Sequence, residues 1–148
     1  MRCMLAVVVV ALSVLGCAST KTDTDQRANQ GERSMQIYYL EIVTKDVDAV
    51  CAVYAAANGL QFGEPDAGLG NARTAALRGG GMVGVRAPMR ESEEPVVRPY
   101  WLVDDIEAAV AVAVDAGAQL AHPPLEIPGH GTFAIYIEGG VEHGLWQR

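Results

Sequence analysis

The chain has 148 residues, 50% of them hydrophobic, so it is long enough to bury a full core, and one globular domain is expected. Its 18 acidic residues outnumber 11 Lys and Arg, which gives a formal net charge of −7. This acidic balance argues against nucleic acid as a partner, because phosphate backbones are bound by a surplus of positive charge.

The first twenty residues have the layout of a secretory signal peptide. Arg2 is basic, an apolar run extends from Met4 to Leu15, and small residues flank Cys17. The run is too short to favour a membrane-spanning helix, which needs about 20 apolar residues. We therefore expect residues 1–16 to be removed.

The motif VLGC, which ends at Cys17, resembles the lipobox of bacterial lipoproteins, in which the cysteine is diacylated and becomes the first residue. The resemblance implies a lipid anchor in the cell envelope. No Asp follows Cys17, which in a Gram-negative host favours the outer membrane, facing the periplasm. The alternative is an ordinary secreted protein that is cut nearby. Residues 17–35 are polar and without period, and they predict a flexible tether.

A strand and a helix are predicted at the start of the following segment. Residues 36–43, QIYYLEIV, are rich in β-branched and aromatic side chains, and residues 46–60 form an apolar-striped helix that begins with Asp and ends in Asn-Gly-Leu. Cys51 lies on that stripe, so a buried structural thiol is expected. Removal of residues 1–16 would take Cys3 away and Cys17 would carry lipid, so Cys51 is left alone and no internal disulfide is expected. Further strand candidates are Gln61–Glu64, Ala72–Arg78 and Met82–Arg86.

The same order of elements then repeats. RPYWLV predicts a strand, and the next segment is a helix opened by Asp105 and closed by Gly117. Asp46-Val47-Asp48-Ala49 matches Asp105-Ile106-Glu107-Ala108 at an offset of 59, and LRGGGMVGV matches IEGGVEHGL at an offset of 60. The last strand candidates are residues 121–127, 132–138 and 141–147.

Two βαβββ modules, residues 36–88 and 97–148, are therefore predicted in one domain that spans residues 36–148. An acidic, proline-bounded connector, PMRESEEPVVRP, joins them, and its acidic run of Glu91, Glu93 and Glu94 indicates a solvated segment. One module alone would leave the core face of its sheet uncovered, whereas two modules can cover each other.

This tandem pattern resembles the vicinal oxygen chelate superfamily, which includes glyoxalase I, bleomycin-resistance proteins and extradiol dioxygenases. The resemblance rests on the Asp-opened helix that ends in Asn-Gly-Leu, on WLVDDIEAAV and on the closing GLWQ. It implies an α+β fold in which eight strands form an incomplete barrel, a cup with helices outside and the ligand site within. Most enzymes of the superfamily bind a divalent metal there through side chains from both modules.

The metal ligands that the resemblance implies are missing from this sequence. Their positions fall on Tyr39, Arg98 and Gly144, or on Leu145 if the last strand aligns without a gap, and residues 72–86 hold no Glu or His. None of these residues suits a divalent site, and a guanidinium repels cations. We therefore predict no cofactor, with a divalent metal as the alternative.

Strand alternation assigns the side chains to faces. With Tyr39 facing the cup, Glu41 also faces inward, and Leu40 and Ile42 face a helix. The last strand leaves two alternatives. If Gly144 faces the cup, so do Glu142 and Trp146, and His143 points to the helix side. If Leu145 faces the cup instead, His143 does too, and it becomes a candidate ligand for a metal or a substrate.

The predicted lining of the cup combines aromatic walls with few polar anchors, which is typical of a small-molecule pocket. Its members are Tyr39, Glu41, Arg98, Tyr100, Tyr136 and Trp146. His130 is expected at the rim, and His122, beside two prolines, in a loop or edge strand. The candidates for acid/base chemistry are Glu41, His130 and His143.

Three functions remain open from the sequence. The first is a lipid-anchored domain that binds a small anionic or polarised molecule in a metal-free cup, with Arg98→Ala weakening binding more than His143→Ala. The second is a lyase, isomerase or dioxygenase-type enzyme that acts on a small oxygenated substrate. The third is a structural role in the envelope. The expected partners are a small molecule and, through the lipid, a membrane, and the chain is expected to be a monomer or a homodimer.

Overall fold

The computed structural model of the protein describes residues 35–148, which belong to a compact unit that spans Ser34–Arg148. The predicted signal peptide, Cys17 and nearly all of the predicted tether lie outside the described residues. In residues 35–148, no helix has the length and apolar character needed to cross a membrane.

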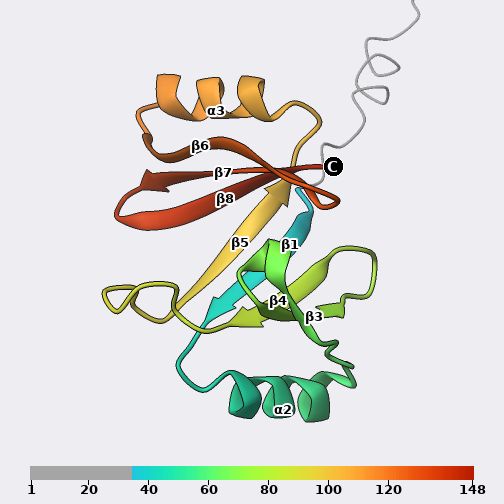
Figure 1. Ribbon diagram of the computed structural model, residues 1–148. Coiled ribbons are helices and arrows are strands. Elements are labelled where there is room, and N and C mark those ends of the chain that lie inside the picture. Colours follow the sequence, from blue (N-terminus) through green and yellow to red (C-terminus); the bar gives the residue numbers. More distant parts are fainter. Residues whose placement is uncertain (1–34) are drawn as a thin grey trace, which may run out of the picture. The chain divides into compact units, whose positions relative to one another are not determined.

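The described chain consists of two successive units with the same order of elements (Figure 1). The first holds β1 (Ile37–Val43), α2 (Val47–Asn58), β2 (Pro65–Asp66), the short 3-10 helix η1 (Ala67–Leu69), β3 (Ala72–Ala76) and β4 (Met82–Arg86). The second holds β5 (Val96–Leu102), α3 (Ile106–Asp115), β6 (Gln119–Ile127), β7 (Gly131–Glu138) and β8 (Val141–Gln147). The βαβββ repeat predicted from the sequence is confirmed.

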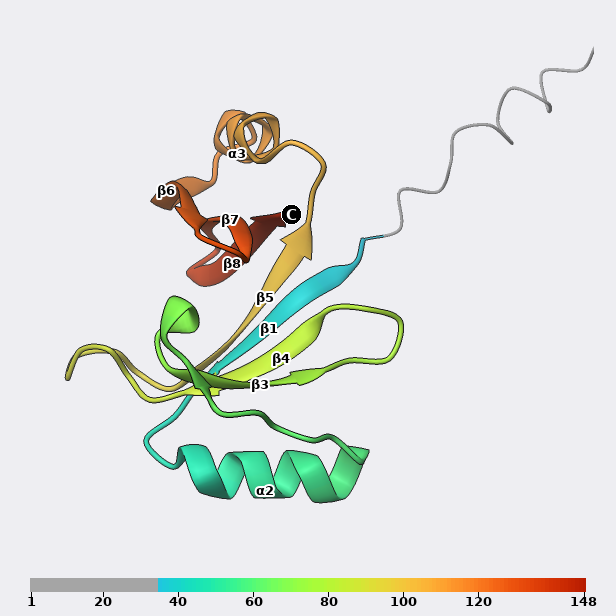
Figure 2. The same cartoon turned by 45° about the vertical axis from the view of Figure 1, so that its right-hand side comes forward.

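The strands of residues 35–148 form one eight-stranded mixed sheet in the order β2-β3-β4-β1-β5-β8-β7-β6. β1 and β5 pair antiparallel at its centre, and each pairs in parallel with the last strand of its own module, β4 or β8. Figures 1 and 2 show α2 and α3 at opposite ends of this curved sheet, outside it. The fold is therefore α+β, an unclosed cup of the vicinal oxygen chelate type, as predicted.

Three clusters of buried side chains follow from strand alternation. One lies between α2 and the strands of the first module and includes Ile42, with Leu40 packed against it. The second lies under α3 and includes Leu145. The third lies inside the cup and includes Tyr39 and Trp146. The predicted division of β1 into a cup face and a helix face is confirmed.

The helices begin and end where the sequence indicates. The Asp105 side chain accepts a hydrogen bond from the backbone N–H of Ala108 at 3.0 Å and so caps α3. Gly59 ends α2 in the left-handed conformation, with φ 66°. Cys51 lies on the buried face of α2, as expected, and burial raises the pKa of its thiol, which keeps it protonated.

The predicted strand at Gln61–Glu64 is wrong. The edge strand of this module is the two-residue β2, which pairs with β3 only at Pro65 and Asp66. Proline has no N–H to extend the ladder, and the chain turns at once into η1, where the Asp66 side chain accepts from the backbone N–H of Gly68 at 2.9 Å. The predicted strand at residues 72–78 also ends early, at Ala76, before a glycine-rich turn.

The register of β8 decides between the two sequence alternatives. Gly144 lies opposite Tyr100 of β5, and Glu142 and Trp146 line the cup on the same face. Leu145 packs under α3. The alternative with Gly144 inward is therefore correct, and His143 points away from the cup.

Two glycines on the cup face make room for aromatic rings. A Cβ on Gly84 would lie 2.2 Å from the Tyr39 hydroxyl oxygen, and a Cβ on Gly144 would lie 2.2 Å from Cδ1 of Tyr100. The two glycines occupy matching places in the two modules, on β4 and β8. Each lets a tyrosine ring lie flat across the strand where a side chain would otherwise project.

We therefore expect Gly84→Ala and Gly144→Ala each to lower the free energy of unfolding by about 1–3 kcal/mol, because the added methyl group overpacks a tyrosine ring. Urea denaturation measures this. Gly63→Ala is the matched control, because its Cβ would meet nothing closer than the Thr74 carbonyl oxygen at 3.8 Å. Equal midpoints for all three variants would show that the rings do not occupy these places.

Candidate functional site

The concave face of the sheet borders a cavity of about 590 Å³. This volume is within the range of about 300–1,000 Å³ that small-molecule sites occupy. One part of the wall is apolar and includes Leu69, Leu125, Ile127, Phe133, Ile135 and Trp146. Another part is charged and includes Glu41, Arg86, Glu93, Arg98 and Glu142. The cavity therefore has two ends with different chemistry.

The apolar end is built on packed aromatic rings. The Trp146 ring centroid lies 5.4 Å from that of Tyr39 and 5.7 Å from that of Tyr100, and the second pair meets edge to face. The Trp146 indole N–H donates to the backbone carbonyl of His130 at 3.1 Å. These contacts fix the rings, so the wall is formed before any ligand arrives.

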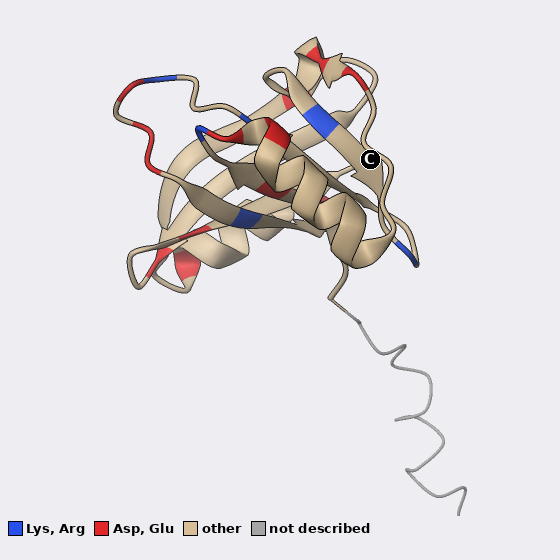
Figure 3. Cartoon of the chain, turned by 90° about the horizontal axis from the view of Figure 1, so that it is seen from below, with Lys and Arg blue, Asp and Glu red and all other residues tan. Residues whose placement is uncertain are grey.

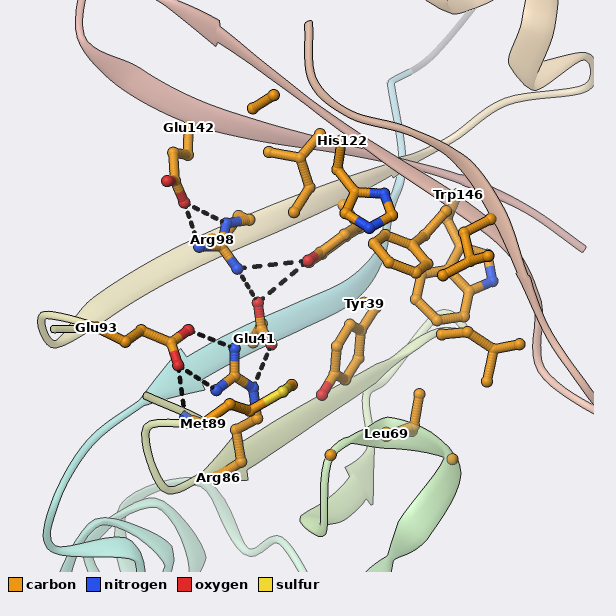
Figure 4. Close-up of a pocket in the computed structure, with 18 of the residues that line it drawn as sticks. Tyr39, Glu41, Leu69, Arg86, Met89, Glu93, Arg98, His122, Glu142 and Trp146 are labelled. Carbon is orange, nitrogen blue, oxygen red and sulfur yellow. Dashed lines mark hydrogen bonds and ion pairs between the residues drawn. The ribbon is translucent and has the colours of Figure 1, made fainter. Parts of the chain in front are cut away.

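The charged end is organised around Glu41, which is 5% exposed. Its Oε1 accepts from Nε of Arg86 at 2.6 Å, and its Oε2 accepts from Nη1 of Arg98 and from the Tyr100 hydroxyl, the latter at 3.1 Å. Glu41 and Arg98 are direct cross-strand neighbours on β1 and β5, which explains their contact. Figure 4 shows both guanidinium groups converging on this carboxylate.

Each arginine also binds a second carboxylate. Arg86 donates from Nη1 and Nη2 to the two oxygens of Glu93, at 2.9 and 2.7 Å. Arg98 donates from Nε and Nη2 to one oxygen of Glu142. Three carboxylates and two guanidinium groups thus alternate in a chain with a net charge of −1. We call these five side chains, Glu93, Arg86, Glu41, Arg98 and Glu142, the ion network.

The structure corrects the interpretation of the connector. Glu91 and Glu94 are exposed, as predicted, but Glu93 turns inward and its side chain is only 14% exposed. The hydrogen bond from Arg86 is the main cause that lowers the pKa of Glu93 to about 2. Burial opposes this by raising the pKa, and a hydrogen bond from the Met89 backbone N–H lowers it further. The carboxylate therefore stays ionised at any physiological pH. Figure 3 shows that the exposed connector carries residues of both signs.

The Tyr39 hydroxyl is the unsatisfied polar group of the cup. Tyr39 is 3% exposed, and no polar atom of residues 35–148 hydrogen-bonds with its hydroxyl. Burial, followed by the nearby charge of Glu41, raises the pKa of Tyr39 above its ordinary value, so the group stays a neutral donor. A buried hydroxyl with no partner is uncommon and indicates a place for a partner.

Most of the predicted lining is brought together. The cavity wall includes Tyr39, Glu41, Arg98, Tyr100 and Trp146. The placement of Tyr136 in the cup is wrong. Phe133 and Ile135 face the cavity, so alternation along β7 turns Tyr136 to the α3 side, where it packs on the cluster under that helix.

The three acid/base candidates do not meet. His143 stacks on Tyr136, with ring centroids 5.1 Å apart, on the α3 side of the sheet. His130 lies before β7, and its Nε2 is 3.1 Å from a carboxylate oxygen of Asp66, which ties the two modules together at the rim. Within the described residues, neither histidine belongs to the cavity wall, so Glu41 is the candidate that remains in the cup.

The sequence interpretation missed several residues of the wall. His122 lies on the edge strand β6, as one alternative predicted, but it also lines the cavity. Its ring packs on that of Phe133, with the ring centroids 4.8 Å apart. The sequence pattern places Arg86 in a strand and predicts no role for it. Its place could have been found, because Gly84 matches Gly144 in the repeat and Arg86 therefore matches the inward-facing Trp146.

The side chains of the cup do not fit the divalent metal that the superfamily implies. Arg98 and Tyr39 stand where ligands are expected, and a tyrosine ring covers Gly144. Each carboxylate of the ion network is bound by a guanidinium, so a cation would have to displace arginines that stay charged beside it. Among residues 35–148, no group of three or more His, Cys, Asp or Glu side chains is placed to hold a metal.

Known structures share the fold at low sequence identity. A hypothetical protein from Bacillus halodurans C-125 has a TM-score of 0.62 and 16% identity, and the match covers 78% of this chain and 96% of that one. Methylmalonyl-CoA epimerase from Mycobacterium tuberculosis gives 0.60 and 17%, over 75% and 86%. A variant of the Streptomyces coelicolor epimerase in complex with 2-nitronate-propionyl-CoA gives 0.57 and 20%, over 77% and 95%.

These likenesses establish the vicinal oxygen chelate fold for residues 35–148. No protein-family model matches the chain. No curated protein matches it either.

The absence of a stoichiometric metal stays a prediction. We expect the purified mature protein, incubated with Zn²⁺, Mn²⁺ or Ni²⁺ and then gel-filtered, to retain far less than one ion per chain by elemental analysis. The physical reason is that guanidinium groups already occupy the carboxylates. About one ion per chain after gel filtration would contradict this account of the cup.

Proposed function

We propose that the domain binds one small organic molecule in the cup. The molecule is apolar over most of its surface and carries one polar group that accepts a hydrogen bond. The observation that carries this proposal is Tyr39, whose side chain lines a preformed cavity and whose buried hydroxyl has no hydrogen-bond partner in residues 35–148.

The apolar end supports a ligand body of aromatic or branched aliphatic character. Trp146 and Phe133 are held by each other and by the tyrosines, so ligand binding orders few side chains. Burial of apolar ligand surface contributes roughly 25 cal/mol per Å² removed from water. Because the wall is rigid beforehand, little of that gain is offset by lost side-chain entropy.

The polar end favours a ligand group that accepts hydrogen bonds. The Tyr39 hydroxyl is a neutral donor, and leaving it unpaired in the folded protein costs about 1–3 kcal/mol. A carbonyl, carboxylate or phenolate oxygen would relieve that cost. Arg98, to which the sequence assigned this task, already donates to Glu41 and Glu142. We therefore assign the first contact to Tyr39 and a supporting charge to Arg98.

Isomerase-type catalysis is the alternative, favoured by the fold likeness to methylmalonyl-CoA epimerases. It would need a carboxylate of the cup to exchange a proton with the ligand. Glu41 already accepts three hydrogen bonds, from two guanidinium groups and one phenol, which leaves only one of its roughly four acceptor sites for a ligand. Glu142, whose side chain is 40% exposed, is the freer carboxylate. Binding without chemistry is the better supported of the two functions.

Tyr39→Phe tests the proposed contact. We expect thermal-shift screening of small aromatic acids, ketones and phenols to find ligands, and Tyr39→Phe to weaken the best of them about tenfold in calorimetry, the worth of one buried hydrogen bond. The free variant should be at least as stable as the parent, because only an unpartnered hydroxyl is removed. Arg98→Ala is a poorer test, since it strands Glu41 and Glu142 as well.

Tyr136→Phe is the matched control, because Tyr136 loses the same atom on the α3 side of the sheet. Its ligand affinity should equal that of the parent. If Tyr39→Phe and Tyr136→Phe bind every hit as tightly as the parent does, the ligand does not meet the Tyr39 hydroxyl and the proposal is wrong.

We also propose that the protein is anchored in the cell envelope through acylated Cys17, on the strength of the VLGC motif alone. Mass spectrometry of the mature N-terminus should find a diacylated Cys17, and Cys17→Ser should release the protein from the membrane fraction, since a single acyl chain or none gives only weak attachment. An unmodified N-terminus, or Cys17→Ser protein that stays with the membranes, would contradict the anchor.

A further inference from the structure

Glu93 sits on Arg86 in the way that a bound carboxylate ligand would. Its two oxygens accept from two different nitrogens of the guanidinium, at 2.9 and 2.7 Å, which is the paired geometry by which arginine recognises free carboxylates. Arg86 is 3% exposed and lies in the cavity wall at the charged end. The pair is therefore an internal carboxylate bound in the ligand cavity.

Glu93 comes from the connector and not from the sheet. Residues 87–95 join β4 to β5 and belong to no strand or helix. The connector has its own turn, in which the backbone N–H of Glu93 donates to the carbonyl of Arg90 at 3.0 Å and that of Met89 donates to the Glu93 carboxylate at 2.7 Å. This turn stays complete if it moves as one piece, so the contact with Arg86 is a tie that can be released.

The charges of the ion network allow the exchange. Without Glu93, the two guanidinium groups are balanced by Glu41 and Glu142, and the remaining group is neutral. The N–H groups of Arg86 that face Glu93 would then be buried without an acceptor, which is costly. A carboxylate from a ligand restores both the hydrogen bonds and the net charge of −1, whereas a neutral ligand group restores only part of them.

The rest of Arg86 would hold its place during the exchange. Its Nε stays bound to Glu41 at 2.6 Å, and its Nη1 also donates to the carbonyl of Ala87 at 3.1 Å. Figure 4 shows Tyr39 next to Arg86, on the side that leads to Trp146. A carboxylate on Arg86 could therefore extend an apolar body past the Tyr39 ring toward the indole.

We propose that Arg86 is a carboxylate-binding subsite of the cup, closed by Glu93 in the free protein and taken over by the carboxylate of the ligand. The inference rests on the proposed function and deepens it, because it makes the ligand an organic acid with an apolar body. The ligand must then displace Glu93, and with it the connector, from Arg86. Glu93 then sets both the affinity and the selectivity of the cup.

Removal of Glu93 tests the subsite with a simple pair of probes, 3-phenylpropanoate and its neutral amide. The chain has two tryptophans, so Trp101→Phe leaves Trp146 as the fluorescent reporter in the cavity. In this background we expect Glu93→Ala to bind the carboxylate about tenfold or more tightly than the parent does, because the competing internal carboxylate is gone. The affinity for the amide should stay unchanged.

Glu91→Ala and Glu94→Ala are the matched controls, since both remove a carboxylate from the exposed part of the same connector. They should bind both probes as the parent does. In a second measurement, the melting temperature of Glu93→Ala should fall below that of the parent and rise again with sodium acetate, more than with sodium chloride at equal ionic strength. Should Glu93→Ala fail to fold, Glu93→Gln is expected to change the affinities in the same direction.

The subsite is wrong if Glu93→Ala binds 3-phenylpropanoate no more tightly than the parent does, or if Glu91→Ala gains as much affinity as Glu93→Ala. It is also wrong if acetate raises the melting temperature of Glu93→Ala no more than chloride does. If the parent then binds the amide as well as the acid, binding in the cup stands and the carboxylate subsite alone is wrong. If neither probe binds any variant, the subsite is also wrong. The proposed function is judged separately, by the comparison of Tyr39→Phe with Tyr136→Phe.

Discussion

The burial of the Glu41 carboxylate on the central strand pair is the constraint on which the rest of the cup depends. A carboxylate that is 5% exposed must be neutralised and hydrogen-bonded, and Glu41 meets this need with Arg86 from its own module and Arg98 from the other. Each arginine, buried in turn, needs a further carboxylate, and Glu93 and Glu142 supply them. One buried charge thus fixes side chains on β1, β4, β5, β8 and the connector.

The same network is the reason why we expect no metal in this cup. A divalent ion and an arginine are alternative ways to neutralise inward-facing carboxylates, and the chain uses arginine. The aromatic rings that lie over Gly84 and Gly144 fill the space that metal-binding side chains at these two positions would need. What remains is a cavity with a rigid aromatic end, a self-balanced ionic end and the side chain of Tyr39, whose hydroxyl has no hydrogen-bond partner among residues 35–148. Such a cavity is suited to recognise a ligand by its shape, by one hydrogen bond and by a carboxylate that replaces Glu93 on Arg86.

The sequence was sufficient for the fold and for part of the site because periodicity is local. The repeat of residues 46–49 at 105–108 predicted both modules. The family resemblance placed Tyr39 in the cup, and alternation along β1 then placed Glu41 on the same face. Tyr136 was misplaced because alternation gives two faces without saying which is inward, and β7 has large side chains on both, Phe133 and Ile135 on one and Tyr136 on the other. Glu93 was missed for a different reason. A glutamate in an acidic connector has no local signal of a partner, and the partner, Arg86, is brought near by tertiary structure alone.

Glu41 and Arg98 should depend on each other across the two modules, and a double-mutant cycle measures that dependence. Urea denaturation of the parent, Glu41→Gln, Arg98→Met and the double variant gives the coupling energy between the two side chains. We expect a coupling of about 1.5 kcal/mol or more, with each single variant destabilised because it strands a buried charge. Additive effects, within about 0.5 kcal/mol, would contradict it.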